Sequence, residues 1–196
     1  MLQSVYLTEK DLDKIGFKSL GNNVRISSDA RIYGAHNISI GSNVRIDDFV
    51  TISANTGFVD IHDNVFIARG CHISGFYGVV LGRFSSMAAN VLIYSASDDY
   101  SGKFLTAQAI PQKYTSHIGG TVEIGKHVII GAHCVILGGC RIGEGCSIGS
   151  MSLIKGDLEP WGMYWGIPVK RGKNRSKELL QLEKKLIQEY PEFRQL

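Results

Sequence analysis

The sequence predicts an all-β protein, a parallel β-helix of about six coils with a short N-terminal helix, a long inserted loop and a C-terminal helix. An isoleucine recurs every six positions from Ile124 to Ile154, and the same period of large aliphatic residues, with slips, runs from Ile26 to Ile93. A period of six fits neither an α-helix nor an alternating strand, but it fits short strands joined by corners. Three hexads close one triangular coil, and stacked coils bury a continuous apolar column.

Two positions of each hexad are predicted to face the core. The large aliphatic residue points inward, and so does the small residue four places later. This second position holds all four cysteines, Cys71, Cys134, Cys140 and Cys146. We interpret them as small core residues, and free thiols agree with a reducing compartment. Glycine follows the aliphatic residue in four of the last six hexads, and we expect it to supply backbone angles that other residues disfavour.

The two ends of the chain are predicted to be helical. Thr8 and Asp11 form a capping-box pattern and Gly16 ends the first helix, which we expect to cover the open end of the apolar column. A second helix is predicted over 176–190, folded back on the β-helix or used as a subunit contact. Its apolar stripe consists of Leu179, Leu182, Leu186 and Ile187.

The chain divides into three predicted segments. Residues 1–21 form the N-terminal cap, 22–162 the β-helix with its insertion, and 163–196 a basic segment followed by the second helix. The net charge is +3, and the basic residues gather in KRGKNRSK rather than over a face, which argues against a nucleic-acid partner. No apolar run reaches the roughly 20 residues of a membrane span, and the N-terminus lacks the pattern of a signal peptide. We therefore expect a cytoplasmic protein.

The repeat stops once, between Ile93 and Ile124. The two residues are 31 positions apart where six are expected, and residues 94–119 form a loop rich in aromatic and acidic residues. Long irregular loops in compact domains are usually functional or disordered, and this composition favours a function. We expect the chemistry of the protein to lie here.

The hexads resemble those of the hexapeptide-repeat acyltransferase superfamily, whose members are left-handed β-helices. This resemblance covers residues 22 to about 170 and implies a homotrimer with active sites between subunits, acetyl-CoA as co-substrate, a small-molecule sugar acceptor and no metal. The segments IGFKSLGNNV, IDDFV, SASDDYSG and PWGMYWGIPVKRGKNRSK resemble more closely the acetyltransferases of bacterial surface-polysaccharide pathways. Some of these acetylate nucleotide-linked amino sugars such as dTDP-4-amino-4,6-dideoxyglucose.

The resemblance also identifies candidate catalytic residues. In the maltose and galactoside O-acetyltransferases a histidine early in this loop is the base, but here Asp98 stands at that place, and Ala68 stands where those relatives have an asparagine. Either His117, late in the loop, takes the proton, or the acceptor is an amine, which is a better nucleophile than a hydroxyl. In the second case Asp98 or Asp99 would orient the amine and take up its proton. His72 is a reserve base.

The remaining candidates follow from the same resemblance. The residues expected to bind the co-substrate are Ala132, Ser150, Lys155, Lys170 and Lys173, the last two near its phosphates. The residues expected to bind the acceptor are Tyr94, Ser97, Tyr100, Asp47 and His72, although Asp47 also fits a solvated corner. His127 and His133 fit surface or interface positions.

Three other functions are compatible with a β-helix of this kind to different degrees. A sugar O-acetyltransferase would use the same fold on a hydroxyl acceptor. A γ-type carbonic anhydrase would need histidines gathered on one edge to bind zinc, and the spacing of histidines here does not provide this. A trimeric scaffold without catalytic activity would bind no CoA.

Overall fold

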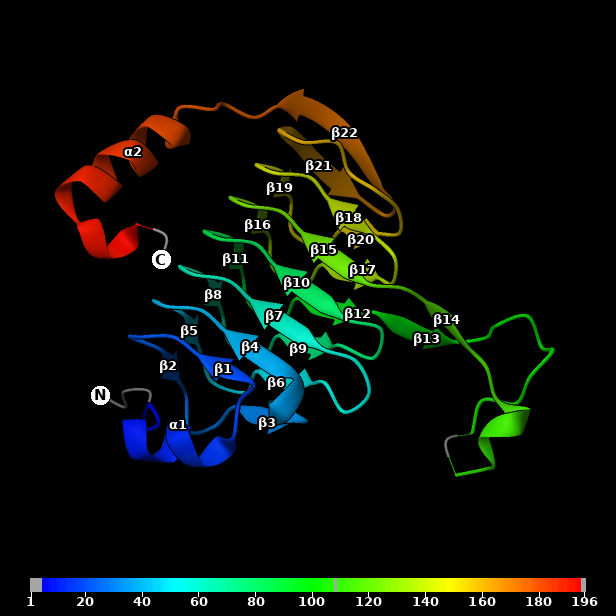
Figure 1. Cartoon of the computed structure of the whole chain (residues 1–196). Helices are drawn as coiled ribbons and strands as arrows, with labels where there is room; N and C mark the ends of the chain where they lie inside the picture. Colours follow the sequence, from blue (N-terminus) through cyan, green and yellow to red (C-terminus); the bar gives the residue numbers. More distant parts are fainter. Residues whose placement is uncertain (1–4, 108, 195–196) are drawn as a thin grey trace.

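The chain is a left-handed parallel β-helix with three faces. The computed structural model describes residues 5–107 and 109–194, so position 108 of the inserted loop and the two chain ends lie outside it. The coils stack from α1 (Glu9–Ile15) at one end to β21 and β22 at the other, as Figure 1 shows. No helix among the described residues is long and apolar enough to cross a membrane.

Each face is one sheet, and its strands come from successive coils. The first face contains β1 (Ser19–Leu20), β4 (Ile38–Ile40), β7 (Val59–Ile61), β10 (Val79–Leu81), β15 (Val122–Ile124) and β18 (Arg141–Ile142). The second contains β2 (Arg25–Ile26), β5 (Arg45–Ile46), β8 (Phe66–Ile67), β11 (Ser86–Met87), β16 (Ile129–Ile130), β19 (Ser147–Ile148), β21 (Gly162–Gly166) and β22 (Val169–Asn174). The third contains β3 (Arg31–Tyr33), β6 (Thr51–Ser53), β9 (His72–Ser74), β12 (Leu92–Tyr94), β17 (Val135–Leu137) and β20 (Leu153–Ile154). We call the turn from the first to the second face the first corner, and name the second and third corners likewise.

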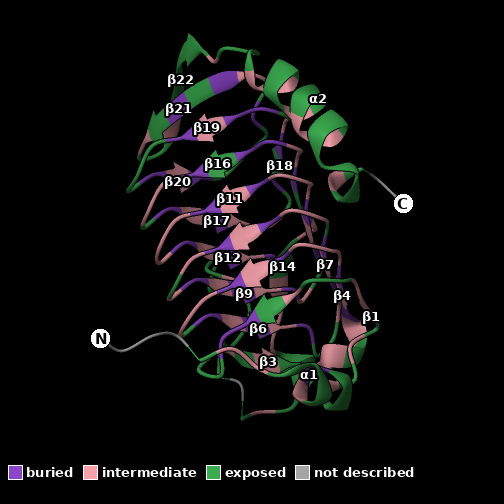
Figure 2. Cartoon of the chain, turned by 90° about the vertical axis from the view of Figure 1, so that its left-hand side faces the viewer, coloured by how far each residue is buried: buried purple, intermediate pink, exposed green. Residues whose placement is uncertain are grey.

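The predicted aliphatic column is confirmed. All of its members are buried except Ile32, which is partly buried, and they pair in register from coil to coil. Ile130 pairs with Ile148, 18 positions later, whereas Ile46 pairs with Ile67 because the earlier coils hold extra residues. Figure 2 shows the result, with buried segments alternating with partly buried ones along the stack. The four cysteines are free and buried in this column, as expected.

Left-handed backbone occurs at another position of the hexad than expected. The glycines directly after the aliphatic residues, such as Gly131, do not have positive φ. Positive φ occurs instead three places after the aliphatic residue, at Asn43 and Asn64 in the early coils and at His127 and His133 in the later ones. Gly131 is required for another reason, because a Cβ there would lie 2.5 Å from the backbone nitrogen of Ser150 in the next coil. The expectation about glycine angles was therefore wrong, and close approach of coils is the cause.

The N-terminal helix forms as predicted. Thr8 caps it, with Thr8 and Asp11 in a reciprocal capping box, and Gly16 ends it in the left-handed region. Leu12 is the buried residue of the helix and joins the core cluster, so α1 covers the first coil.

The C-terminal helix α2 (Leu179–Glu189) is shorter than predicted and lies along the first corner, on the far side of the β-helix from the insertion (Figure 1). Glu183 anchors it, because its carboxylate lies 2.7 Å from Lys126 Nζ and 2.8 Å from His127 Nε2. His127, predicted at a surface or interface position, also stacks on Phe84 and is 8% exposed, so it is buried in the contact between α2 and the β-helix. Leu182, a member of the predicted apolar stripe, is 64% exposed in the single chain and does not pack on the β-helix.

Arg175 and Arg83 fix the two ends of this C-terminal segment. Before α2, one guanidinium nitrogen of Arg175 donates to the carbonyl oxygens of His127, Gly145 and Cys146 at 2.7–3.2 Å. After α2, Arg83 donates to the carbonyl oxygen of Phe193 at 3.1 Å. The segment therefore folds back along the stack through polar contacts, and no residue of α2 is fully buried.

Replacing Gly131 by alanine is expected to destabilise the β-helix by about 1–3 kcal/mol, because the added methyl group overlaps the backbone of Ser150. Gly156→Ala is the matched control, since a Cβ at Gly156 meets nothing within 4 Å. It should stay within about 0.5 kcal/mol of the unchanged protein. Chemical unfolding followed by circular dichroism measures both, and equal midpoints for the two variants would contradict the packing argument.

Candidate active site

The insertion begins as a small sheet beside the third corner. Strand β13 (Ala96–Asp98) pairs antiparallel with β14 (His117–Gly119), and the register places Asp98 opposite His117. His117 Nε2 lies 3.6 Å from Asp98 Oδ1, a distance that suits an ion pair when the imidazole is protonated but is too long for a hydrogen bond. Both side chains are partly exposed, so they can reach a ligand. The two residues proposed from the sequence as alternative proton acceptors are thus neighbours.

Asp99, the other acidic candidate, is turned toward its own loop. Its carboxylate accepts a hydrogen bond from the backbone nitrogen of Ser101 at 2.5 Å. Hydrogen bonds from the side chain and backbone of Ser101 hold the pKa of Asp99 below its ordinary value. Asp99 is therefore a carboxylate near neutral pH and orders the turn that follows β13.

Among the predicted acceptor-binding residues, His72 and Tyr94 lie together on the third face. Their rings are 5.3 Å apart, on the neighbouring strands β9 and β12. Burial lowers the pKa of His72, so its imidazole is neutral at neutral pH. Ser97 lies in β13 opposite Ile118, and Tyr100 is 87% exposed at the start of the loop. Tyr94 and Ser97 therefore lie next to the base of the insertion, whereas His72 begins β9 at the other edge of the third face.

Asp47 lies elsewhere. It follows β5 at the second corner, where Arg45 Nε contacts its carboxylate at 2.7 Å and the Tyr6 hydroxyl donates to it at 3.3 Å. This ion pair gives Asp47 a structural partner two coils before the insertion. The structure does not bring Asp47 to the other acceptor-binding candidates within one chain.

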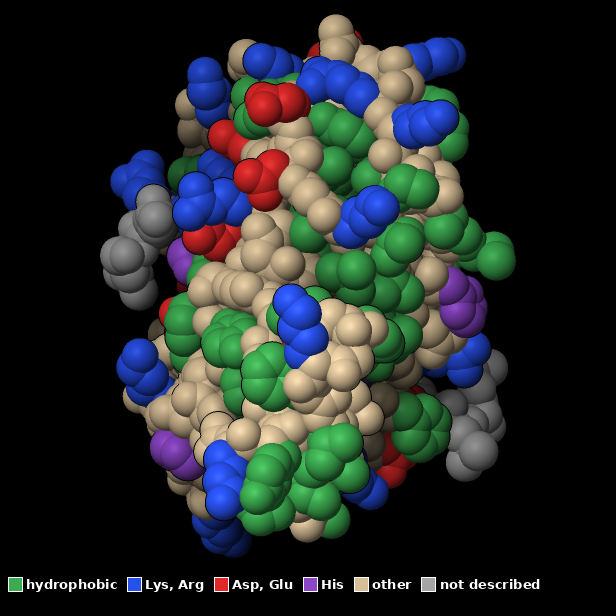
Figure 3. Space-filling view, turned by 90° about the vertical axis from the view of Figure 1, so that its right-hand side faces the viewer, with side chains coloured by type: hydrophobic (Ala, Val, Ile, Leu, Met, Phe, Trp, Pro, Cys, Tyr) green, Lys and Arg blue, Asp and Glu red, His purple; other side chains and the backbone are tan. Residues whose placement is uncertain are grey.

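The predicted co-substrate residues lie at three places in the C-terminal coils: the second corner, β22 and the third corner. Ala132 and Ser150 follow β16 and β19 at the second corner, and the nitrogen of Met151 donates to the oxygen of Ala132 at 2.8 Å. Lys170 and Lys173 lie on β22, a strand that the hexad pattern did not predict, and both are exposed. Figure 3 shows Lys and Arg side chains gathered in the upper part of the molecule, toward these coils. Lys155 is exposed directly after β20, near the third corner.

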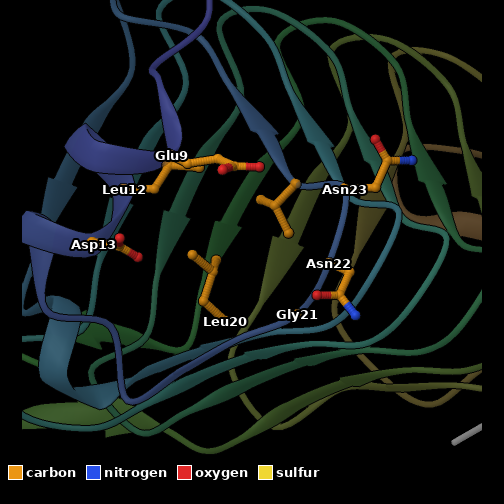
Figure 4. A pocket seen from close by; sticks show the side chains of 8 residues that line it. Glu9, Leu12, Asp13, Leu20, Gly21, Asn22 and Asn23 are labelled. Atoms are coloured by element: carbon orange, nitrogen blue, oxygen red, sulfur yellow. The ribbon is translucent and has the colours of Figure 1, made fainter.

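A hollow of about 500 Å³ lies at the opposite end of the β-helix, beside α1 (Figure 4). Leu12 and Leu20 form its apolar part, and Glu9, Asp13 and the amides of Asn22 and Asn23 form its rim. The lining contains no histidine, cysteine or basic residue. We therefore assign it to the join between α1 and the first coil rather than to the active site.

The cysteines are poor nucleophiles. Burial raises the pKa of Cys71 to about 11, and burial also raises the pKa of Cys134, Cys140 and Cys146. A thiol with a raised pKa has almost no thiolate at neutral pH. In the described part of the chain, no three His, Cys, Asp or Glu side chains come together in a way that could hold a metal ion.

Sequence reasoning missed Phe76 and Tyr77, which lie in the turn between β9 and β10. The Phe76 ring is 4.9 Å from the His117 ring. The available signal was the spacing of Ile73 and Leu81, which are eight positions apart instead of six and so leave two residues outside the coil.

Comparison with known proteins identifies close relatives. A family described as bacterial transferase hexapeptide (six repeats) matches residues 121–156. The dTDP-4-amino-4,6-dideoxy-D-glucose acyltransferase of Escherichia coli is 46% identical over 178 residues, which cover 91% of this chain and 93% of that protein.

Solved structures agree with this. AntD, an N-acyltransferase from Bacillus cereus in complex with dTDP and 3-hydroxybutyryl-CoA, is 38% identical and has a TM-score of 0.91, covering 96% of this chain and all of AntD. A serine-to-alanine variant of AntD in complex with dTDP-4-amino-4,6-dideoxyglucose and coenzyme A is 39% identical, with a TM-score of 0.91 over 95% of this chain and all of the variant.

The cysteines are expected to resist modification in the folded protein. With the native chain at about pH 8, a disulfide reagent such as Ellman's should label none of the four thiols rapidly, because the thiols are buried and protonated. All four should react after unfolding in guanidinium chloride. Fast labelling of one thiol in the native protein would restore that cysteine as a candidate nucleophile.

Proposed function

The chain belongs to the hexapeptide-repeat acyltransferases, in the group of the dTDP-4-amino-4,6-dideoxy-D-glucose acyltransferases, and from this membership we propose that it moves an acetyl group from acetyl-CoA to the amino group of that nucleotide sugar. The 46% identity across nine-tenths of the chain carries the proposal. The paired Asp98 and His117 at the base of the insertion supply the chemistry that an amine acceptor requires.

The reaction is a direct transfer within a ternary complex. The acceptor nitrogen attacks the thioester carbonyl, a C–N bond forms, the C–S bond breaks, and CoA leaves as the thiolate. The nitrogen must lose a proton, and His117 is the proposed acceptor, with Asp98 stabilising the imidazolium that results. The raised cysteine pKa values favour this route over an acyl-enzyme on sulfur.

The proposed co-substrate site lies at the second corner. Gly131 and Ser150 approach closely there, and the pantetheine arm would run along the backbone beside the half-buried Ala132. The exposed ammonium groups of Lys170 and Lys173 suit the phosphates of CoA. Lys155 would approach the same ligand from the third corner.

The active chain is proposed to be a homotrimer. The co-substrate corner and the insertion lie at opposite edges of the third face, on either side of β12 and β17. A site that uses both therefore suits two neighbouring chains better than one. We place the enzyme in the cytoplasm, where free thiols persist, and its product in the synthesis of a bacterial O-antigen or capsule.

Purified chain should acetylate dTDP-4-amino-4,6-dideoxyglucose with acetyl-CoA, measured as CoA thiol release together with the mass of the product. The matched control acceptor carries a hydroxyl in place of the amine. It should be at least about a hundredfold worse in kcat/KM, because an amine is the better nucleophile and the site is built for it. A hydroxyl acceptor of equal or better rate would favour the O-acetyltransferase alternative. No turnover with either acceptor, and no CoA binding, would favour the inactive scaffold.

His117→Ala is expected to lower kcat/KM by at least about tenfold, because the proposed proton acceptor is lost. His62→Ala is the control, since His62 is exposed at the first corner, away from both the insertion and the co-substrate corner. Initial rates across a range of about pH 6 to 9 measure both variants. Activity of His117→Ala close to that of the unchanged enzyme would remove His117 from the proton pathway and leave Asp98.

A further inference from the structure

The turn Gly75–Gly78 lies at the third corner, one coil before the insertion, and presents Phe76 and Tyr77 toward the insertion. We propose that this turn positions the imidazole of His117, an inference that rests on the proposed function of that residue. The contacts of the turn with the insertion include the ring and the backbone of His117.

Each aromatic residue of the turn holds a different part of His117. The Phe76 ring lies 4.9 Å from the imidazole with 31° between the planes. The Tyr77 hydroxyl donates to the carbonyl oxygen of His117 at 3.3 Å. The two aromatic rings contact each other edge to face, with centroids 4.9 Å apart. The side chain and the backbone of His117 are thus both held from the preceding coil.

Hydrogen bonds with Ser95 and Thr121 hold the turn in place. Ser95, which is 0% exposed, accepts a hydrogen bond from the Tyr77 nitrogen at 2.9 Å and donates to the Ser74 oxygen at 2.8 Å. The Thr121 hydroxyl donates to the Tyr77 oxygen at 2.9 Å. Ser95 and Thr121 flank the insertion, so the two ends of the insertion and the turn are joined by hydrogen bonds.

The coil below supports the turn as well. Gly78 has a φ of 108°, and a Cβ there would lie 2.4 Å from the Phe58 ring. Gly75 packs as closely, because its Cβ would lie 2.5 Å from the Phe58 carbonyl oxygen. Because Gly75 and Gly78 have no Cβ, the turn can pack directly against Phe58 of the previous coil.

The imidazole thus has two neighbours, the Phe76 ring at 4.9 Å and the Asp98 carboxylate at 3.6 Å. A proton acceptor works only when it is held within a fraction of an ångström of its productive position. An aromatic face also favours a cation beside it, and the imidazolium is that cation after proton transfer. Phe76 is therefore a positioning residue, not a catalytic one.

A double-mutant cycle tests the proposal. Phe76→Leu keeps apolar bulk but removes the ring, and it should lower kcat about tenfold while KM changes less than about threefold. In the His117→Ala background the same change should cause no further loss, because Phe76 acts through His117. Phe76→Tyr keeps the ring and should restore most of the activity. A loss from Phe76→Leu that is just as large without His117 would overturn the proposal.

Phe66→Leu provides the matched control. Phe66 is a half-buried aromatic residue on the second face, where it contacts Arg45 and not the insertion. It should leave kcat within about twofold, and unfolding curves of all variants identify any general loss of stability. A tenfold loss in kcat from Phe66→Leu as well would contradict a specific role for Phe76.

A second readout does not depend on activity. The ring current of Phe76 should shift the NMR resonances of the His117 ring, and Phe76→Leu should remove that shift while Phe66→Leu preserves it. Unmoved His117 resonances in Phe76→Leu would overturn the proposal. Should the unchanged chain fail to transfer acetyl groups, the proposed function fails, and the NMR measurement still decides whether Phe76 orients His117.

Discussion

The close approach of successive coils at the corners is the constraint on which the rest of the structure depends. Strands of only two or three residues cannot hold a sheet alone, so each coil relies on hydrogen bonds from the coils before and after it. At Gly131 and Gly125 the next coil comes so near that no Cβ fits. Three places after the aliphatic residue the backbone becomes left-handed, which suits Asn, Gly and His. These two requirements keep every inward side chain in register.

The candidate site is supported by the same stacking. Ser95 and Gly120, at the two ends of the insertion, are joined by a backbone hydrogen bond of 2.9 Å. Below them lies the turn with Phe76 and Tyr77, and above them Gly138 packs on the Ser95 carbonyl. The insertion therefore leaves from a closed base between two regular coils. The proposed proton-handling pair, Asp98 and His117, lies on the small sheet next to that base.

Much of the fold could be predicted because every hexad repeats one geometry. The aliphatic column, the cysteines in the core, the capped α1 and the position of the insertion all follow from periodicity or local capping chemistry. Contacts between distant segments could not be predicted in this way. Glu183 makes the inner face of α2 partly polar, and its carboxylate contacts His127, which is buried under the helix. Leu182 is exposed. Phe76 meets His117 only because the coil before the insertion stacks beneath it.

The residue types of the proposed site could be selected from the sequence, but their arrangement in space could not. Residue types that handle protons could be selected from the irregular segment, and two of them, Asp98 and His117, are neighbours across β13 and β14. Their pairing depends on the antiparallel register of β13 and β14, which cannot be predicted from the six-residue period of the repeat. Asp47 shows the opposite case, since an acid that looked available for a sugar is engaged by Arg45 and Tyr6.

The register across the insertion also bears on how such proteins diversify. Leu81 pairs with Ile124, 43 positions later, in the same register in which Ile124 pairs with Ile142, 18 positions later. The strand register is therefore the same with and without the inserted loop. Because loop closure costs little more for a longer segment, this corner tolerates exchange of whole segments. Recombination at Ser95 and Gly120 would exchange the insertion, with the site residues proposed in it, while the β-helix stays unchanged.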